Sequence, residues 1–353
     1  MYIAYVKSPA GTVITQIHGI SEVVVQARLN DTWSASFKIR WDNEANTLSV
    51  LQEFNRVKLY KQESTWVEKL LFEGYMKAPE TDDEWTYINM GDMGDFFKTK
   101  FLWVGKTYTW STLDFILTDI LSDVNARFAT WITLDCWVTD VIPDKTYSEG
   151  QDIYSIFQDL IAWGYEFKIE KDVLYFKTSI WIDRTIPGEN YLEYTFDKDN
   201  SSSNTIINPK TTFNSENIAN YVKVKWPAWI VTRNDAASII TFWSVERFIS
   251  SSWTNTTTAD QILLDKKDST REIDVAPVSF DFFEVWVGDT VQIYINSKNV
   301  IWNYTWGSKV LEKKYISWDL EKVSIKLSTS QSKTLTLLET IIKIKERQKH
   351  LEL

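Results

Sequence analysis

Few residues in this sequence have the chemistry for catalysis or metal binding, and they lie far apart. There is one cysteine, Cys136, and there are two histidines, His18 and His350. A metal site or an activated nucleophile needs several such side chains at suitable spacings, and neither histidine lies near Cys136 in the sequence. We therefore expect no metal site, no cofactor and no thiol chemistry, and we expect Cys136 to be a buried strand residue.

Carboxylates are the remaining candidates for chemistry. Asp82, Asp83 and Glu84 form one acidic group, and Asp197 and Asp199 form another. A glycoside hydrolase needs two carboxylates that face each other across a cleft, and the sequence alone does not show such a pair. The sequence also lacks a nucleophile elbow, a phosphate-binding loop, a dinucleotide-binding turn and a calcium loop. A carboxylate-based hydrolase stays an alternative, but no catalytic, cofactor-binding or metal-binding residue is predicted.

Composition sets broad limits on the class of protein. The 353 residues suffice for two or three domains, and an apolar fraction of 44% is ordinary for a folded soluble chain. The net charge is −10, and a basic stretch is visible only at the C-terminal end, so sequence-specific binding of nucleic acid is not expected. No apolar run approaches the length of a membrane span, and the N-terminus is not a signal peptide. The single cysteine excludes an intrachain disulfide, which fits assembly in a reducing compartment.

Tryptophan is unusually frequent and glycine unusually rare. The chain has 18 Trp and 11 Gly, whereas glycine normally takes about 7% of positions. Together the two types make 29 residues, about 8% of the chain, which is close to a normal glycine share. Several tryptophans also lie in expected turns, where a positive φ favours glycine. These turn positions are Trp33, Trp110, Trp163, Trp286, Trp302 and Trp306.

We therefore hypothesise that many of these tryptophans stand for the codon UGA, which some bacterial lineages read as glycine. Trp41 and Trp85 lie in strand-like segments and are expected to be genuine. The alternative is a chain truly rich in tryptophan, in which exposed rings form platforms for sugars, as in a carbohydrate-binding module.

The residues from Thr146 to Thr178 form the clearest structural unit of the sequence. Apolar residues recur at helical spacing from Ile153 to Ile161, and Gly164 follows where a helix stop is favoured. From Tyr165 to Phe176 the pattern then alternates across a polar turn, which is typical of a β-hairpin. We predict a helix that packs on the hairpin.

This unit lies between two β-rich regions, so the predicted fold class is α+β and mostly β. We expect a β-rich domain at 1–100, a small α/β domain of helix, strand, helix and hairpin at 101–185, and a β-rich domain with one helix at 186–330. An amphipathic helix with a basic end is expected at 331–353.

Some local predictions carry specific residues. A capping box at Ser111 and Asp114 should start the first helix of the α/β domain, and a strand should follow at 132–138. In the third region we predict a loop at 197–209, a strand at 237–242 and a helix at 257–267.

The order of these parts resembles the tail-tip hub proteins of long-tailed bacteriophages, the siphophage baseplate-hub or minor tail proteins. The resemblance spans nearly the whole chain, and the order and spacing of weak motifs carry it. Reading Trp163 and Trp286 as glycine strengthens it. The segments concerned are Ser34–Ile39, Arg56–Tyr60, Ser111–Leu113, Tyr154–Phe167, Asn220–Val224 and Val287–Val291.

The resemblance implies a structural protein and not an enzyme. Proteins of this family form a trimeric ring at the tail end, link the tail tube to receptor-binding or fibre proteins, and line the channel through which DNA and the tape-measure protein pass. It therefore implies a homotrimer in the virion, at the phage tail tip, made in the cytoplasm of a bacterial host. Distal tail proteins would be further neighbours, and no lytic domain is expected.

Overall fold

The computed structural model describes most of residues 1–328 and divides the chain into two compact units. The first unit comprises Met1–Trp181, Asp281–Val287 and Glu312–Ser324; the second comprises Ile182–Phe280, Gly288–Leu311 and Ile325–Leu353. The residues outside the description are 65–66, 129–131, 137, 139, 143, 162–164, 171–172, 178–181, 189, 215–217, 227–228, 243, 251–258, 261–262, 264–269, 279–284, 297–303, 318–320 and 329–353.

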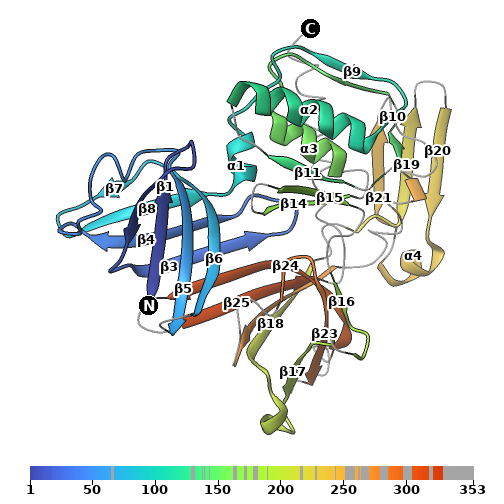
Figure 1. Ribbon diagram of the computed structural model, residues 1–353. Coiled ribbons are helices and arrows are strands. Elements are labelled where there is room, and N and C mark those ends of the chain that lie inside the picture. The colour runs from blue at the N-terminus through green and yellow to red at the C-terminus, as the bar shows by residue number, and fades with distance from the viewer. Residues whose placement is uncertain are drawn as a thin grey trace. The chain divides into compact units, whose positions relative to one another are not determined.

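The first unit begins with an antiparallel sheet (Figure 1). In β4 (Ser34–Arg40), the residues Ala35, Phe37 and Ile39 are buried and those between them are not, because successive side chains of a strand point to opposite faces. The strand order is β24–β3–β4–β8–β6–β5–β1–β2, with β7 paired to β8. The other strands are β1 (Tyr2–Lys7), β2 (Val13–Ile17), β3 (Ser21–Arg28), β5 (Arg56–Ser64), β6 (Val67–Met76), β7 (Glu80–Thr81), β8 (Trp85–Gly91) and β24 (Tyr304–Ser317).

Late residues of the chain complete this sheet. Residues 312–317 of β24 pair with β3, and Glu312 lies opposite Arg28. The Tyr2 hydroxyl on β1 hydrogen-bonds with the Tyr315 hydroxyl on β24 and donates to Glu321 Oε1 at 2.9 Å. The Lys61 ammonium on β5 donates to Glu321 Oε2 at 2.7 Å. The first strands of the chain are therefore tied to residues that follow them by about 260 positions or more.

The α/β part of the first unit packs two helices on a three-stranded sheet. Helices α2 (Leu113–Phe128) and α3 (Ile153–Ile161) cover one face of β11 (Thr133–Asp135), β14 (Glu166–Glu170) and β15 (Val173–Lys177) (Figure 1). Strand β15 runs antiparallel to β14 and parallel to β11. The remaining elements are α1 (Met93–Phe97), β9 (Lys106–Tyr108), β10 (Ser111–Thr112), β12 (Val141–Ile142) and β13 (Lys145–Tyr147).

The predicted helix and hairpin of the central stretch are confirmed by α3, β14 and β15. Gly164 lies outside the described residues. The predicted capping box is wrong: the Thr112 hydroxyl, and not Ser111, accepts from the Phe115 amide at 3.4 Å. Ser111 instead pairs with Ile142 in a short ladder. The strand predicted at 132–138 is shorter, since β11 ends at Asp135.

The strands of the second unit belong to two sheets, a large one and a three-stranded one. Strands β16 (Asp183–Arg184) and β17 (Glu193–Asp197) run parallel to β23 (Thr290–Asn296), which pairs with the beginning of β24. Strand β22 (Thr270–Pro277) lies between β18 (Ile206–Asn214) and the end of β25 (Glu321–Ser328). The three-stranded sheet is β20 (Trp229–Asn234), β19 (Tyr221–Trp226) and β21 (Glu246–Ser250).

Two local predictions in this unit are wrong. Residues 236–242 form helix α4 (Ala236–Phe242) and not a strand, because the Asp235 carboxylate accepts from the Ser238 amide at 2.8 Å and caps a helix start. The loop predicted at 197–209 contains the short helix η1 (Ser201–Ser203) and the beginning of β18. Most of the helix predicted at 257–267 lies outside the described residues, and so does the whole of 331–353.

The general fold class is confirmed, since the described chain is mostly β with a few short helices. The domain boundaries near residues 100, 185 and 330 stay predictions.

Candidate functional site

A turn between β3 and β4 docks on the α/β part of the first unit. Asn30 adopts a left-handed φ of 51°, which asparagine tolerates better than most residues. Its side-chain oxygen accepts from the Phe167 amide at 3.2 Å, and its backbone carbonyl accepts from Gln158 Nε2 at 3.1 Å. The neighbouring Asp31 carboxylate accepts from the Tyr154 hydroxyl at 2.8 Å. Polar groups of α3 and β14 thus fix the end of a β-hairpin, and we call this contact the docking joint.

Asp92 holds the same turn from the other side. It caps helix α1: Oδ1 accepts from the Asp95 amide at 2.9 Å, and Oδ2 accepts from the Trp33 amide at 2.8 Å. Its own amide donates to the Trp33 carbonyl at 3.1 Å. The side chain is buried, and burial raises the pKa of the Asp92 carboxyl to about 7.

This pKa makes a pH dependence testable. The folded chain holds the Asp92 proton up to about pH 7, whereas an aspartate in the unfolded chain loses it near about pH 4. The folded state therefore binds more protons in that window, and the contribution of Asp92 to stability falls as pH rises through it. We expect the Asp92→Asn variant to lack this fall when thermal midpoints are compared at pH 5 and pH 8. If the thermal midpoints of the variant and the parent changed equally between pH 5 and pH 8, titration of Asp92 would not contribute to the pH dependence of stability.

Two tryptophans extend the docking joint to the segment before the Val-Gly-Asp-Thr turn. The rings of Trp33 and Trp286 stack with centroids 6.3 Å apart. The ammonium groups of Lys313 and Lys168 lie 4.9 Å and 5.4 Å from the centroid of the Trp286 ring, within the range of cation–π attraction. Lys313 is 1% exposed, and its Nζ donates to the Val285 carbonyl at 2.9 Å. The Trp286 ring and the Val285 carbonyl thus compensate the buried charge of Lys313.

Gly288 and Asp289 of the Val-Gly-Asp-Thr turn belong to the second unit, and each has a structural reason. Gly288 adopts a φ of 104°, a backbone conformation that is unfavourable for residues with a side chain. The Asp289 side chain, 1% exposed, accepts from the Ile182 amide at 3.0 Å and from Arg184 Nε at 2.7 Å. This buried pair fixes β16 against the start of β23.

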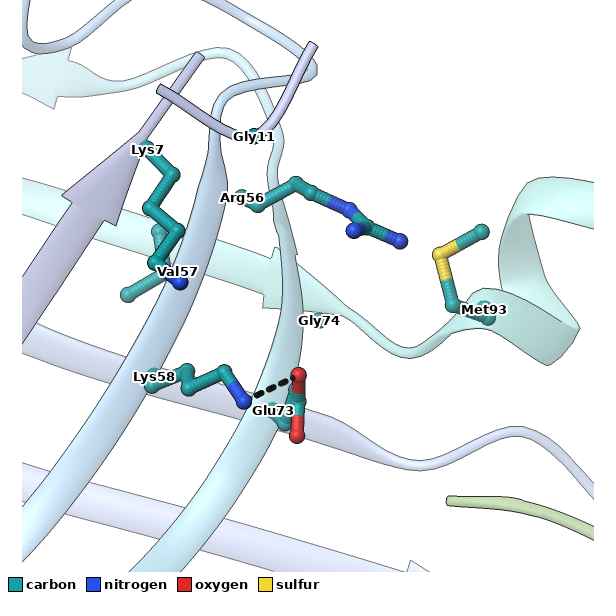
Figure 2. A pocket seen from close by; sticks show the side chains of 8 residues that line it. All are labelled: Lys7, Gly11, Arg56, Val57, Lys58, Glu73, Gly74 and Met93. Atoms are coloured by element: carbon teal, nitrogen blue, oxygen red, sulfur yellow. Dashed lines mark ion pairs between the residues drawn. The ribbon is translucent and has the colours of Figure 1, made fainter. Parts of the chain in front are cut away.

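A pocket of the first unit lies among basic residues (Figure 2). Lys7, Arg56 and Lys58 line it, and Lys58 pairs with Glu73 at 2.8 Å. Its volume of about 100 Å³ is below the roughly 300–1,000 Å³ of typical small-molecule sites. It is therefore too small to hold an oligosaccharide for cleavage.

The residues considered for chemistry are not brought together. The prediction that Cys136 is a buried strand residue is wrong, since it is half-buried and follows the end of β11. Burial raises the pKa of its thiol, which disfavours a nucleophilic thiolate. His18 is exposed, and His350 lies outside the described residues. Within the described ranges, no group of three or more His, Cys, Asp or Glu side chains is arranged to hold a metal ion.

Asp82, Asp197 and Asp199 of the two acidic groups have structural partners. Asp82 accepts from the amides of Glu84 and Trp85, which lowers the pKa of its carboxyl. Asp197 and Asp199 both accept from the side-chain amide of Asn296. Asp82 thus stabilises a turn, and Asp197 and Asp199 hold the end of β23, so these three carboxylates have a structural explanation.

Of the suspect tryptophans, Trp110 alone has a left-handed backbone among those that the structure describes, with φ at 47°. Its side chain is 71% exposed. Trp33 and Trp286 do not have a positive φ. Trp163 and Trp302 lie outside the described residues.

The sequence reasoning missed the docking joint. One signal was available, since Asp92 and Asp95 have the spacing of a helix cap and a first-turn carboxylate. Nothing local indicated Lys313 or Tyr154, because their partners lie far away in the chain.

Comparisons with known proteins show the fold of phage tail proteins. The chain matches prophage tail protein gp18 from Listeria monocytogenes EGD-e with a TM-score of 0.64 and 12% identity, over 98% of this chain and 99% of that one. It matches the 43 kDa tail protein of prophage MuSo2 from Shewanella oneidensis with a TM-score of 0.63 and 10% identity, over 92% and 97%.

A third match is a component of a bacterial secretion machine. The E. coli c3393 protein, a type VI secretion system component described as structurally similar to the T4 phage tail proteins gp27 and gp5, has a TM-score of 0.53 and 7% identity. The alignment covers 90% of this chain and 77% of that one. No protein-family model and no curated protein sequence matches the chain. The resemblance to phage tail proteins is thus confirmed at the level of the fold.

Proposed function

We propose that this chain, which has the fold of prophage tail proteins, is a structural component of the tail tip of a long-tailed phage, namely its baseplate hub. The observation that carries the proposal is the full-length likeness to the Listeria prophage tail protein, which covers 98% of this chain and 99% of that one. The titratable groups of the docking joint have structural partners, which supports a scaffold role without enzymatic activity.

In this role the chain forms a homotrimeric ring in the virion. The ring links the tail tube to the receptor-binding or fibre proteins, contacts distal tail proteins and surrounds the exit path of DNA and the tape-measure protein. A net charge of −10 supports a channel wall that does not retain DNA, because like charges repel the phosphate backbone. Among the described residues, none of the helices combines the length and apolar character that a membrane crossing requires.

The proposal extends to the genetic code of the source. Several tryptophans would be glycines encoded by UGA, and the left-handed φ of 47° at Trp110 supports this for one of them. Sequencing the gene and measuring peptide masses of the virion protein test it. UGG codons at most of the suspect positions would refute it.

The mass in solution tests the hub assignment. We expect light scattering on a chain with glycine at the suspect positions to give three times the chain mass, or a monomer that becomes a trimer as concentration rises, since ring assembly follows mass action. The chain with tryptophan at those positions, measured in parallel, separates assembly from aggregation through exposed rings. A strict monomer that binds a polysaccharide would contradict the hub and favour a carbohydrate-binding module.

A further inference from the structure

The α/β part of the first unit contains the same short sequence twice. Strand β9 is Lys106-Thr107-Tyr108, and strand β13 is Lys145-Thr146-Tyr147. A helix follows each strand, and each helix carries one aspartate toward its strand. Lys106 Nζ and the Tyr108 hydroxyl donate to Asp119 Oδ2 at 2.6 and 2.7 Å. The same two atoms of the second copy, on Lys145 and Tyr147, donate to Asp159 Oδ2 at 2.7 and 3.1 Å.

The two strands pair with each other as related copies would. They are antiparallel, with Thr107 opposite Thr146, Lys106 opposite Tyr147, and Tyr108 opposite Lys145. Exchanging each residue for its counterpart reproduces the same three pairs, which is the property of a two-fold axis through the central pair.

The main-chain bonds around the helices repeat in the same way. The Leu113 amide donates to the Asp140 carbonyl at 3.1 Å, and the Ile153 amide donates to the Lys100 carbonyl at 2.9 Å. Thr112 lies opposite Val141, and their counterparts Asp152 and Phe101 form the corresponding bridge. In each of these contacts a residue and its counterpart differ by 40 positions, as read from the printed sequence.

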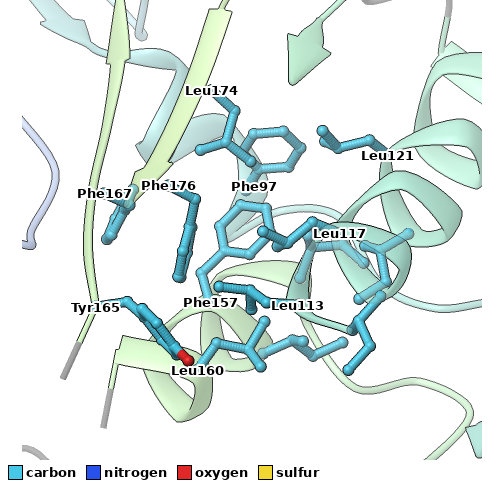
Figure 3. Packing of buried hydrophobic residues seen from close by; sticks show 14 of the residues in the cluster. Phe97, Leu113, Leu117, Leu121, Phe157, Leu160, Tyr165, Phe167, Leu174 and Phe176 are labelled. Atoms are coloured by element: carbon cyan, nitrogen blue, oxygen red, sulfur yellow. The ribbon is translucent and has the colours of Figure 1, made fainter. Parts of the chain in front are cut away.

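The helix caps and core positions follow the same spacing. Thr112 accepts from the Phe115 amide, and Asp152 accepts from the Ser155 amide at 2.7 Å. Five buried apolar residues of α2 have buried apolar counterparts on α3 (Figure 3 shows several). The pairs are Leu113 and Ile153, Ile116 and Ile156, Leu117 and Phe157, Ile120 and Leu160, and Leu121 and Ile161.

The copies differ in length at two places: the second has one residue fewer before the strand and one residue more in the turn between strand and helix. The spacing is 39 residues in the strands and 40 in the helices, so the second turn has one extra residue. Counting back from the caps, Trp110 corresponds to Gly150. Both have left-handed backbones, with φ at 47° and 79°, and they are the two positions of these turns at which a residue without a side chain is favoured.

We propose that residues 100–121 and 140–161 are two copies of one strand–turn–helix unit, related by a local two-fold axis, and that position 110 is a glycine position of that unit. The two copies now make different contacts. Helix α3 supplies Tyr154 and Gln158 to the docking joint, whereas their counterparts on α2, Asp114 and Thr118, are exposed. The second copy therefore became the internal docking face, and the first retained its outer face toward solvent.

Substitutions at the two counterpart positions test the proposal. We expect Trp110→Gly to raise the thermal midpoint by about 2–4 °C, because it removes left-handed strain and loses little packing from an exposed ring. Trp110→Ala should give no such gain, since alanine keeps the strain. Gly150→Trp should lower the midpoint. A matched control is Trp103→Gly, another exposed tryptophan, which does not have a left-handed backbone and should not gain stability.

A turn exchange tests the equivalence of the copies directly. The sequence Ser148–Gln151, grafted in place of residues 109–111, should leave the chain folded with a midpoint at or above that of the parent. Loss of cooperative unfolding in the graft, or a lower midpoint for Trp110→Gly than for Trp110→Ala, would overturn the proposal. The readout is the unfolding of the chain alone, so a failure here is distinct from a failure of the hub assignment.

Discussion

Replacing Asp289 with alanine is expected to lower the free energy of unfolding of the second unit by about 3–5 kcal/mol. The variant removes the carboxylate that pairs with Arg184 at 2.7 Å and accepts from the Ile182 amide at 3.0 Å. The two side chains are 13% and 1% exposed, so the guanidinium left behind is largely shielded from water. Because an unpaired buried charge costs far more than the pair itself contributes, most of the loss arises from the remaining arginine.

Chemical denaturation followed by tryptophan fluorescence measures this loss. The control is Asp199→Ala, since Asp199 forms an exposed ion pair with Lys198 in the same unit, where the expected change is below about 1 kcal/mol. The double variant Arg184→Met with Asp289→Leu should recover much of the stability, because it leaves no charge unpaired. Equal effects for Asp289→Ala and Asp199→Ala would refute the role assigned to the pair.

Replacing Phe157 with alanine is expected to cost about 3–5 kcal/mol in the first unit. Phe157 is fully buried in α3, and its ring lies 5.1 Å from Phe97, 6.0 Å from Phe167 and 6.3 Å from Phe176, measured between centroids. Figure 3 shows this ring at the centre of the cluster, between the hairpin side chains and those of α2. The truncation would leave a cavity between the helices and the sheet, and these elements cannot move together enough to fill it.

The measurement is the denaturant concentration at the midpoint of unfolding, compared between variants whose free energy of unfolding depends on denaturant with the same slope. Phe115→Ala is the matched control, because Phe115 is an aromatic residue on the neighbouring helix that is 57% exposed. Its loss should cost less than about 1 kcal/mol. If the two variants unfolded alike, Phe157 would not be the centre of the core.

Local periodicity was sufficient to predict the elements of the central stretch. The apolar spacing from Ile153 to Ile161 and the alternation around Phe167 each reflect one buried face, so a short window contains the whole signal. Helix α4 was missed because Ile239 and Ile240 are β-branched, while the decisive residue was the cap Asp235 one position before the helix.

The docking joint and the Arg184–Asp289 pair depend on tertiary structure. Tyr154 lies 123 residues from Asp31, and Arg184 lies 105 residues from Asp289, so no local pattern joins them. The duplication is an intermediate case. The Lys-Thr-Tyr sequence that begins at both Lys106 and Lys145 is too short to indicate a duplication by itself. The repeated pairing and hydrogen bonds are the evidence for it.

The pairing of β24 with β3 also sets the order of events on the ribosome. Arg28 and Glu312 are 284 residues apart, so one edge of β3 stays unpaired until the residues of β24 have been translated. At about 5–20 residues per second, that interval lasts roughly 15–60 s. During it β3 has an open edge, which is the kind of edge that pairs with other nascent chains.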